Sequence, residues 1–251
     1  MRVLQVSPRY FPNHGGVEVV VKHISELLTE RGLTVTVYSL DLSHKTVKQQ
    51  KINGVLVKRF KPIVGDPLYL PPPSFIKEIA EEDFDLVHIH NAHTLIPAFV
   101  ALSKKRERKI LLQSHYHKFG QTRIRNSLLN LYKHLLDKLV FPRVEFVLAN
   151  SPYEKKTLRE DFPHNNNIVL IREGMPVAEL GSIKWMPEKP ARILCVGSLI
   201  KYKNIESLLK AFAYLIKTNE EPFKLVIIGD GPEREHLMNL ARRLEIEDYT
   251  E

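Results

Sequence analysis

Short β-branched segments alternate with amphipathic helical segments along the first part of this chain, and this alternation constrains the fold more than any other feature of the sequence. Most of the intervening stretches carry apolar residues at spacings of three and four, as at Val20, Ile24 and Leu28. Such alternation predicts a parallel sheet covered by helices on both faces. The expected strands are Val3–Val6, Thr34–Tyr38, Leu86–Ile89, Lys109–Leu112, Phe146–Ala149 and Ile168–Ile171.

One segment departs from this pattern. In Lys51–Phe60, the pair Asn53-Gly54 lies between apolar residues. An Asn-Gly pair in that setting is a strong short-range signal for a tight hairpin turn. We therefore expect one antiparallel hairpin in an otherwise parallel sheet.

The strand–helix pattern stops near Met175 and starts again at Arg192. The polar stretch between them is rich in proline, which predicts an interdomain linker. The expected domains are an N-terminal domain of residues 1–174, a linker of residues 175–190 and a partial second domain of residues 191–251. The second is expected to contain strands Arg192–Val196 and Lys224–Ile228 and helices Ile205–Lys217 and Glu233–Leu244. Two parallel strands bury little surface, so this part is expected either to continue beyond Glu251 or to lean on the first domain.

Composition narrows the class of protein. Hydrophobic residues make up 43% and charged residues 26% of the 251 residues, which is typical of a globular chain. No apolar run reaches the roughly 20 residues that span a bilayer, and the N-terminal apolar run is too short for a signal peptide. The single cysteine, Cys195, cannot form an internal disulfide. A cytoplasmic location is therefore expected.

The charge balance favours an anionic partner. The chain carries 37 lysines and arginines against 29 acidic residues, a formal net charge of +8. Phosphates and an acidic membrane surface both fit such an excess, whereas no basic run with interleaved aromatic residues indicates a nucleic-acid module. The segment Arg123–Arg143 is basic on one side, with Arg123 and Arg125 near its start, and leucine-rich on the other. It is expected to be either a helix lying on an anionic membrane or a covering helix with solvated charges.

Glycines follow two expected strands at the point where a helix begins. Gly15-Gly16 follows the first strand, and Gly229-Asp230-Gly231 follows the strand that ends at Ile228. Glycines in a strand-to-helix turn can bring backbone N–H groups close to a phosphate, but they also serve in plain turns. The segment from Val196 to Asn204 carries Lys201 and Lys203, which either neutralise a diphosphate or are simply solvated. Both interpretations of each turn stay open.

Five histidines gather where neighbouring parallel strands are expected to end. His88 and His90 alternate on one strand and so point to the same face. The others are His93, His115 and His117. Three interpretations of this group stay open. Three of the histidines could bind a zinc ion, or one could act as a general acid or as a polar contact to a substrate hydroxyl. In the third, the histidines are simply hydrogen-bonded at the strand ends. No Asp or Glu lies within the clusters to support a metal, which weakens the zinc interpretation.

Taken together, these segments resemble the family 4 retaining glycosyltransferases, which have the GT-B fold of two Rossmann-like domains. The resemblance covers nearly the whole chain, and the order and spacing of its motifs are more specific than any one of them. The segments concerned are Tyr10-Phe11-Pro12 with Gly15-Gly16-Val17-Glu18, Asn53-Gly54-Val55, Asp85–His90, Ser114-His115, Val196–Lys203 and Gly229–Glu233.

The resemblance implies transfer of a hexose from a nucleoside-diphosphate sugar to an acceptor hydroxyl with retention, the donor lying in the interdomain cleft. It implies that His115 is the catalytic residue that contacts the transferred sugar, and that Lys203 neutralises the leaving diphosphate without a metal or other cofactor. The residues implied for donor binding are Gly15, Gly16, Ser198, Lys203, Gly229 and Gly231. Those implied on the acceptor side are Glu18, His90, Arg123 and Arg125. Many relatives act on lipid-linked acceptors, so the expected acceptor is either a saccharide or a lipid-linked molecule. The protein is then expected to lie at the periphery of a membrane.

The chain departs from the family pattern at three places. Ser198 stands where the family usually has an arginine that pairs with the diphosphate. Glu173-Gly174-Met175-Pro176 replaces the family's Asn-Gly-Val-Asp segment. The family's paired glutamates would follow Gly231 by some tens of residues, beyond Glu251, so we expect a C-terminally truncated chain whose own activity is open.

Two alternatives to a transferase remain. Ser198 and the early end favour a non-catalytic accessory protein that binds a sugar nucleotide or an acceptor. The lesser alternative is a zinc-dependent hydrolase built on the histidine pairs at His88, His90, His115 and His117.

Overall fold

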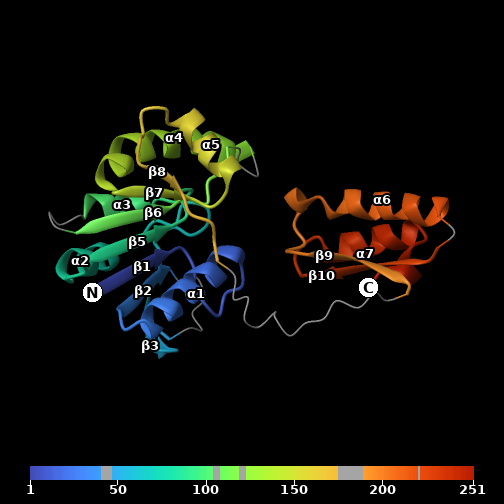
Figure 1. The fold of residues 1–251 in the computed structure, drawn as a ribbon, viewed down its shortest axis with the longest axis horizontal. Coiled ribbons are helices and arrows are strands. Elements are labelled where there is room, and N and C mark those ends of the chain that lie inside the picture. The colour runs from blue at the N-terminus through green and yellow to red at the C-terminus, as the bar shows by residue number, and fades with distance from the viewer. Residues whose placement is uncertain (41–46, 104–107, 119–122, 175–188, 220) are drawn as a thin grey trace. The chain divides into compact units, whose positions relative to one another are not determined.

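A computed structural model describes residues 1–40, 47–103, 108–118, 123–174, 189–219 and 221–251. The chain divides into two compact units, unit 1 from Met1 to Met175 and unit 2 from Pro176 to Glu251 (Figure 1). Most of the expected linker, from residue 175 to residue 188, lies outside the described residues. Each unit is an α/β layer structure and is considered separately.

Unit 1 is built on an eight-stranded sheet in the order β3-β4-β2-β1-β5-β6-β7-β8. Neighbouring strands run parallel, with the single exception of the β3–β4 pair among the described residues. All six strands expected in this unit are confirmed. The strands are β1 Arg2–Ser7, β2 Thr34–Leu40, β3 Gln49–Ile52, β4 Val55–Phe60, β5 Leu86–His90, β6 Lys109–Gln113, β7 Phe146–Ala149 and β8 Ile168–Leu170.

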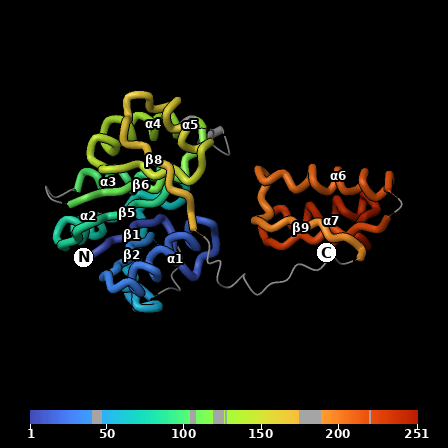
Figure 2. The backbone as a smooth tube through the Cα atoms, in the orientation of Figure 1, coloured from blue at the N-terminus to red at the C-terminus, as the bar shows by residue number. Residues whose placement is uncertain are grey.

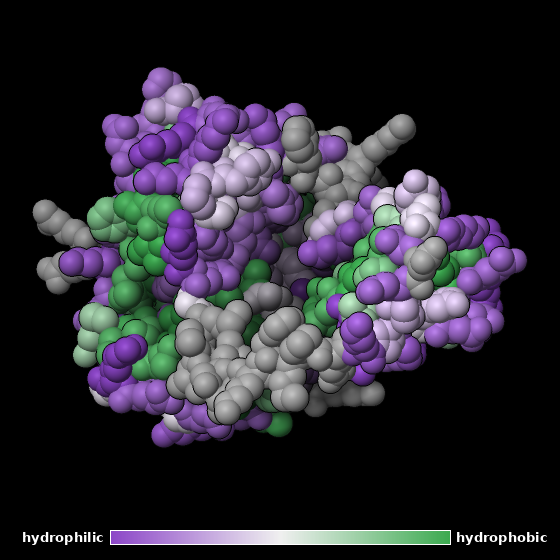
Figure 3. Space-filling model, turned by 45° about the vertical axis from the view of Figure 1, so that its right-hand side comes forward, coloured by the Kyte–Doolittle hydropathy of each residue, from purple (hydrophilic) through white to green (hydrophobic). Residues whose placement is uncertain are grey.

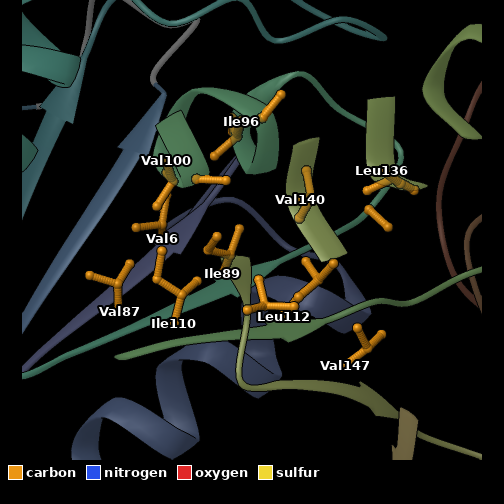
Figure 4. Packing of buried hydrophobic residues seen from close by; sticks show 14 of the residues in the cluster. Val6, Val87, Ile89, Ile96, Val100, Ile110, Leu112, Leu136, Val140 and Val147 are labelled. Carbon is orange, nitrogen blue, oxygen red and sulfur yellow. The ribbon is translucent and has the colours of Figure 1, made fainter. Parts of the chain in front are cut away.

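One face of this sheet carries the main apolar core of unit 1. Alternate side chains of the central strands point into it, such as Val87 and Ile89 of β5 and Ile110 of β6 (Figure 4). Burial of such side chains is the largest favourable contribution to folding. The helices that contribute to this core are α2 Pro73–Glu81, α3 Ile96–Leu102 and α5 Pro152–Asp161, together with the turns that follow α4 Arg123–Leu135.

The opposite face is divided into an apolar part and a polar part. Helix α1, Gly16–Glu30, packs its Val21 against Val3 and Val37 of the underlying strands. Next to this apolar cluster the same face carries polar side chains, because strand alternation sends every second residue of β1, β5 and β6 to it. These residues are Gln5, His88, His90 and Gln113, all of them buried. The polar part of the face is where the candidate site is built.

The expected hairpin is confirmed. Strands β3 and β4 pair antiparallel, with Ile52 opposite Val55. Asn53 and Gly54 form the turn with φ angles of 46° and 84°. Two consecutive left-handed residues are what a tight turn of this type requires, and Asn and Gly adopt them most readily.

The basic segment Arg123–Arg143 is helical, but it is not one regular α-helix as expected. Helix α4 ends at Leu135, a π-helical turn covers Leu136–Val140, and a 3₁₀ turn covers Phe141–Arg143. Pro142 has no N–H to continue an α-helical ladder. The change in winding places Leu136, Val140 and Phe141 in the apolar core.

Unit 2 contains two parallel strands, β9 Ala191–Val196 and β10 Phe223–Ile228, with helices α6 Ile205–Thr218 and α7 Arg234–Arg243. The expected elements are therefore confirmed. The two helices pack beside each other (Figure 2) and against the side chains of one sheet face, where Leu225 is fully buried.

The second face of this small sheet is apolar and exposed in the described residues. Leu194, Val196 and Ile228 are 61%, 68% and 55% exposed, and hydrophobic atoms are visible at the surface of unit 2 in Figure 3. Parallel sheets are normally covered on both faces. Unit 2 is thus held together by one hydrophobic layer, which makes its stability sensitive to small changes in its loops.

Candidate functional site

Polar side chains converge at the carboxyl edge of the sheet in unit 1. Strands β1, β5, β6 and β7 are neighbours in the sheet, and all four end at this edge. Ligands of open α/β sheets bind outside the carboxyl ends of the strands. The residues brought together are Gln5, His90, Gln113, Ser114, His115 and Asn150, with Glu154 and Glu173 beside them.

The His90 ring is hydrogen-bonded to Gln5, a residue of strand β1. Its Nε2 lies 2.8 Å from the Gln5 Oε1 atom, and both residues are fully buried. The other ring nitrogen, Nδ1, is buried and has no partner among the described residues. An unpaired buried polar atom costs about 1–3 kcal/mol, so a ligand that paired with it would recover that energy.

His88 and His90 point to the same face, as the alternation predicted, and their ring centroids lie 4.3 Å apart. Burial lowers the pKa of His88 to about 4, opposed by a hydrogen bond with Gln113. Burial, and then the neighbouring His88 and His115, hold the pKa of His90 well below the usual histidine value. Both rings are therefore neutral at physiological pH and act as hydrogen-bonding groups.

His115 occupies the tight turn after β6, with a left-handed φ of 46°. Its Nδ1 lies 3.0 Å from Asn150 Nδ2, and its Nε2 is buried without a partner in the described part of the chain. Its ring centroid is 6.0 Å from that of His90. Burial lowers the pKa of His115, while Glu154 and Glu18 pull in the opposite direction. The structure thus brings together the two imidazoles for which the family resemblance implies contacts with the donor sugar and the acceptor, and those contacts stay predictions.

Glu154 fixes the turn that carries His115. This buried residue of α5 accepts hydrogen bonds from the Ser114 hydroxyl at 2.5 Å, the Tyr116 N–H at 2.6 Å and the Asn150 N–H at 2.8 Å. Its own N–H bonds to Ser151 Oγ at 3.0 Å, which caps α5. A single carboxylate therefore ties the end of β6 to the end of β7, and hydrogen bonds to an ionised group are the strong kind.

A second acid approaches His115 from the end of unit 1. Glu173 Oε1 lies 3.6 Å from His115 Nδ1. Burial, and then the charge of Glu154, raise the pKa of Glu173. No acid lies within the histidine segments of the sequence, but the chain returns to them more than fifty residues later and brings Glu173 beside His115.

The loop before α1 is closed by an ion pair. Arg9 Nε lies 2.6 Å from Glu18 Oε1, and Glu18 is buried. The Glu18 carboxylate packs so tightly on Gly15 that a Cβ there would collide with Oε2 and lie 2.9 Å from Cδ. At Gly16 a Cβ would have nothing within 4 Å. A Cβ at Gly15 would therefore displace the Glu18 carboxylate, whereas Gly16 leaves the start of α1 open. The donor-binding role of both glycines stays a prediction.

The remaining histidines stack on one another. His93 and His117 have ring centroids 4.0 Å apart at 14°, and the His117 N–H donates to His93 Nε2 at 3.1 Å. Among the described residues, no group of three or more His, Cys, Asp and Glu side chains is arranged to hold a metal ion. The zinc hydrolase alternative therefore has no support.

The other acceptor-side residues predicted from the sequence are Arg123 and Arg125. Both belong to α4, but their side chains lie outside what the structure describes. No helix in the described ranges combines the length and the apolar character needed to cross a bilayer. A contact of this helix with a membrane stays a prediction.

In unit 2, the two predicted donor-binding loops lie against each other. The Gly197 N–H donates to the Ile228 carbonyl at 3.0 Å, the Leu199 N–H to the Asp230 carbonyl at 2.9 Å, and the Glu233 N–H to the Leu199 carbonyl at 3.0 Å. The backbones approach so closely that a Cβ at Gly229 would collide with the Gly197 carbonyl oxygen. A Cβ at Gly231 would collide with the Leu199 carbonyl oxygen. Both glycines thus have a structural reason to be glycine, and their donor contact stays a prediction.

Replacing Gly229 with alanine is expected to destabilise unit 2 by about 2 kcal/mol, because overpacking a close contact costs about 1–3 kcal/mol. Gly197→Ala is the matched control in the same pair of loops, since a Cβ there meets nothing within 4 Å. The control is expected to change stability by no more than about 0.5 kcal/mol. Hydrogen exchange of the α6 and α7 amides measures both variants, and equal protection would contradict the collision.

Ser198 and Lys203 are both exposed at these loops. Lys203 lies in a 3₁₀ turn, Lys201–Lys203, with its Nζ 5.4 Å from the centroid of the Tyr202 ring. Asn204, with a left-handed φ of 53°, then starts α6. The turn presents a cation next to exposed backbone, which suits a phosphate, but no contact in the structure assigns it that role.

Five residues of the site were not found from the sequence: Gln5, Gln113, Asn150, Glu154 and Glu173. One of them carried a usable signal, because Ser151 followed by Glu154 is a capping-box pattern at the start of a helix. That pattern predicts a local cap. It does not predict that the carboxylate also holds Ser114 and Tyr116, which lie on another strand end.

Two family models match the chain. The Glycosyltransferase Family 4 model matches residues 14–179, and the Glycosyl transferases group 1 model matches residues 182–251. An uncharacterised glycosyltransferase of Methanocaldococcus jannaschii is 27% identical, with 92% of this chain and 64% of that protein covered. The N-acetyl-alpha-D-glucosaminyl L-malate synthase of Bacillus anthracis is 25% identical, with 98% of this chain and 66% of that protein covered. The chain thus spans a little less than two thirds of the length of these relatives.

The fold is similar to that of solved structures as well. HepE of Anabaena in complex with UDP-glucose superimposes with a TM-score of 0.69 at 17% identity, covering 100% of this chain and 68% of that one. At this identity the likeness concerns the fold alone. The expected α/β fold of GT-B type is confirmed.

Proposed function

The chain belongs to Glycosyltransferase Family 4, and on that premise we propose that it transfers a sugar from a nucleoside-diphosphate donor to an acceptor hydroxyl. One observation in the structure carries the proposal: neutral, buried imidazoles at the carboxyl edge of the sheet keep ring nitrogens without partners. Such atoms are costly unless a polar ligand pairs with them. A sugar presents the hydroxyl groups that would do so.

The chemistry we propose is electrostatic. His115 contacts the transferred sugar, His90 and Glu18 lie on the acceptor side, and Lys203 stabilises the leaving diphosphate. Gly15 and Gly16 precede α1, whose N-terminus suits a phosphate. Retention at the anomeric carbon and a hexose as the transferred sugar are supported by the family resemblance. A UDP sugar is supported by the UDP-glucose bound to the structurally similar HepE.

We further propose a saccharide or lipid-linked acceptor, approached from the side of Arg123 and Arg125. The support is the basic composition of α4, whose last turn also carries Lys133 and His134. A non-catalytic binding protein is the second candidate, favoured by Ser198 where the family pattern has an arginine.

We expect the chain to be stabilised by one class of nucleotide sugar in a thermal-shift screen of UDP, GDP and ADP sugars. A ligand at 100 times its dissociation constant adds about 2.7 kcal/mol. Lys203→Ala is expected to weaken that binding about tenfold, since the loss of a charge-assisted contact of about 1.4 kcal/mol has that effect. The matched control is Lys210→Ala, an exposed lysine of the same unit that pairs with Glu206 at 2.6 Å.

Release of the nucleoside diphosphate in the presence of candidate acceptors then separates the two candidates. Binding with release supports a transferase, whereas binding without release supports the accessory protein. Neither binding nor release with any nucleotide sugar would overturn the proposal. An equal loss of nucleotide-sugar affinity in the Lys203 and Lys210 variants would contradict a role for Lys203 in donor binding.

A further inference from the structure

Two side-chain amides, one buried and one half-buried, form a line that leads to His115. Gln113, at the end of β6, is 3% exposed and donates a hydrogen bond from its Nε2 to Asn150 Oδ1. Asn150 in turn places its Nδ2 3.0 Å from His115 Nδ1. Each amide has one donating and one accepting end, so the orientation of one fixes the orientation of the next.

The line begins at Gln113 and ends at His115. Gln113 donates to Asn150 through its Nε2, and Asn150 donates to His115 through its Nδ2, so both hydrogen bonds run in the same direction.

We propose that Asn150 is a positioning residue that holds His115 in the Nε2–H tautomer, so that His115 donates a hydrogen bond to an oxygen of the ligand. An imidazole whose Nδ1 accepts a hydrogen bond must carry its proton on Nε2 when neutral. That Nε2 is the buried atom without a partner. That the ligand oxygen belongs to a sugar rests on the proposed function, whereas the tautomer does not.

The acids near His115 oppose this assignment only weakly. Glu173 would favour a proton on Nδ1, but its Oε1 lies at 3.6 Å, against 3.0 Å for the Asn150 amide. Hydrogen bonds weaken steeply beyond about 3.2 Å. Glu154 is occupied by the Ser114 hydroxyl and two backbone N–H groups. Asn150 cannot turn its oxygen toward His115 without losing its bond from Gln113.

The test is the ¹⁵N spectrum of the histidine rings in the ligand-free protein at neutral pH, with His115 assigned from a His115→Gln variant. In the wild type, Nε2 of His115 is expected to resonate as a protonated nitrogen and Nδ1 as a bare one. In Asn150→Asp the carboxylate can only accept, so Nδ1 is expected to become protonated. Asn165→Asp is the matched control, because Asn165 Oδ1 accepts from the Asn167 N–H at 3.2 Å and has no hydrogen bond to an imidazole within the described residues.

If Asn150→Asp fails to fold, Gln113→Met provides the second variant. It frees the Asn150 amide to rotate and is expected to abolish the single tautomer of His115. A protonated His115 Nδ1 in the wild type would overturn the proposal. So would an unchanged His115 tautomer in both the Asn150→Asp and the Gln113→Met variant. A wild type with the expected tautomer that binds no nucleotide sugar would uphold the role of Asn150 and overturn the proposed function instead.

Discussion

Lowering the pH from 7 to 5 is expected to destabilise unit 1 by about 4 kcal/mol, because two buried histidines have depressed pKa values. His88 has a folded-state pKa of about 4, and that of His90 lies well below the usual value. In the unfolded chain both titrate near 6.5. As the pH falls, the unfolded state therefore binds protons first, and stability is lost between about pH 6.5 and pH 4. His115 adds to the loss, since burial lowers its pKa too.

The measurement is urea unfolding of unit 1 as a function of pH, with the slope of the free energy giving the difference in bound protons. Each buried histidine contributes about 1.4 kcal/mol per pH unit in this window. His88→Gln is expected to reduce the slope by one proton, and His164→Gln, at an exposed position in a turn, is the matched control. A slope close to zero between pH 6.5 and pH 5 would show that these rings are not buried neutral in the folded protein.

Removal of the Glu154 side chain is expected to destabilise unit 1 by about 4 kcal/mol. Glu154→Ala leaves the N–H groups of Tyr116 and Asn150 without their acceptor and the Ser114 hydroxyl with the Leu148 carbonyl alone, and each buried unpaired donor costs about 1–3 kcal/mol. Glu154→Gln keeps one accepting oxygen but turns an NH₂ group toward a donor. The Gln variant is expected to lose about half as much free energy of unfolding as Glu154→Ala.

Glu160→Gln on the same helix is the matched control. Glu160 is 47% exposed and pairs with Lys118 at 3.2 Å. An exposed pair of this kind contributes at most about 1 kcal/mol, so little change is expected. Denaturant unfolding of the three variants gives the comparison. A Glu154→Ala protein as stable as the Glu160 variant would mean that the carboxylate does not hold the two strand ends together.

The local structure was predictable wherever a segment follows one clear rule. The strands of unit 1 were found from their β-branched runs, and the hairpin from Asn53-Gly54. The placement of His88 and His90 on one face followed from strand alternation alone. The basic segment was predicted less well, because its apolar spacing is compatible with one continuous α-helix and gives no sign of the π-helical turn that follows Leu135.

The candidate site was only half predictable. The pattern at the expected strand ends grouped His90 with His115, the family resemblance implied their roles, and the structure places their rings 6.0 Å apart. The groups that orient them were not predicted, because Gln5, Gln113 and Asn150 are ordinary polar residues when read alone. Their roles depend on the order β1-β5-β6-β7 in the sheet, which brings four strand ends together.

The sequence by itself thus determined the elements, their faces and the family, since hydrophobic period, turn residues and motif spacing act over a few neighbouring residues. The tertiary structure alone decided which polar atoms meet. Glu154 reaches Ser114 across forty residues of chain, and the backbone at Gly229 closes on Gly197 between two loops. Contacts of this kind are set by strand order and loop path, because the free energy of a buried hydrogen bond or a close backbone approach depends on its partner and not on its neighbours in the chain.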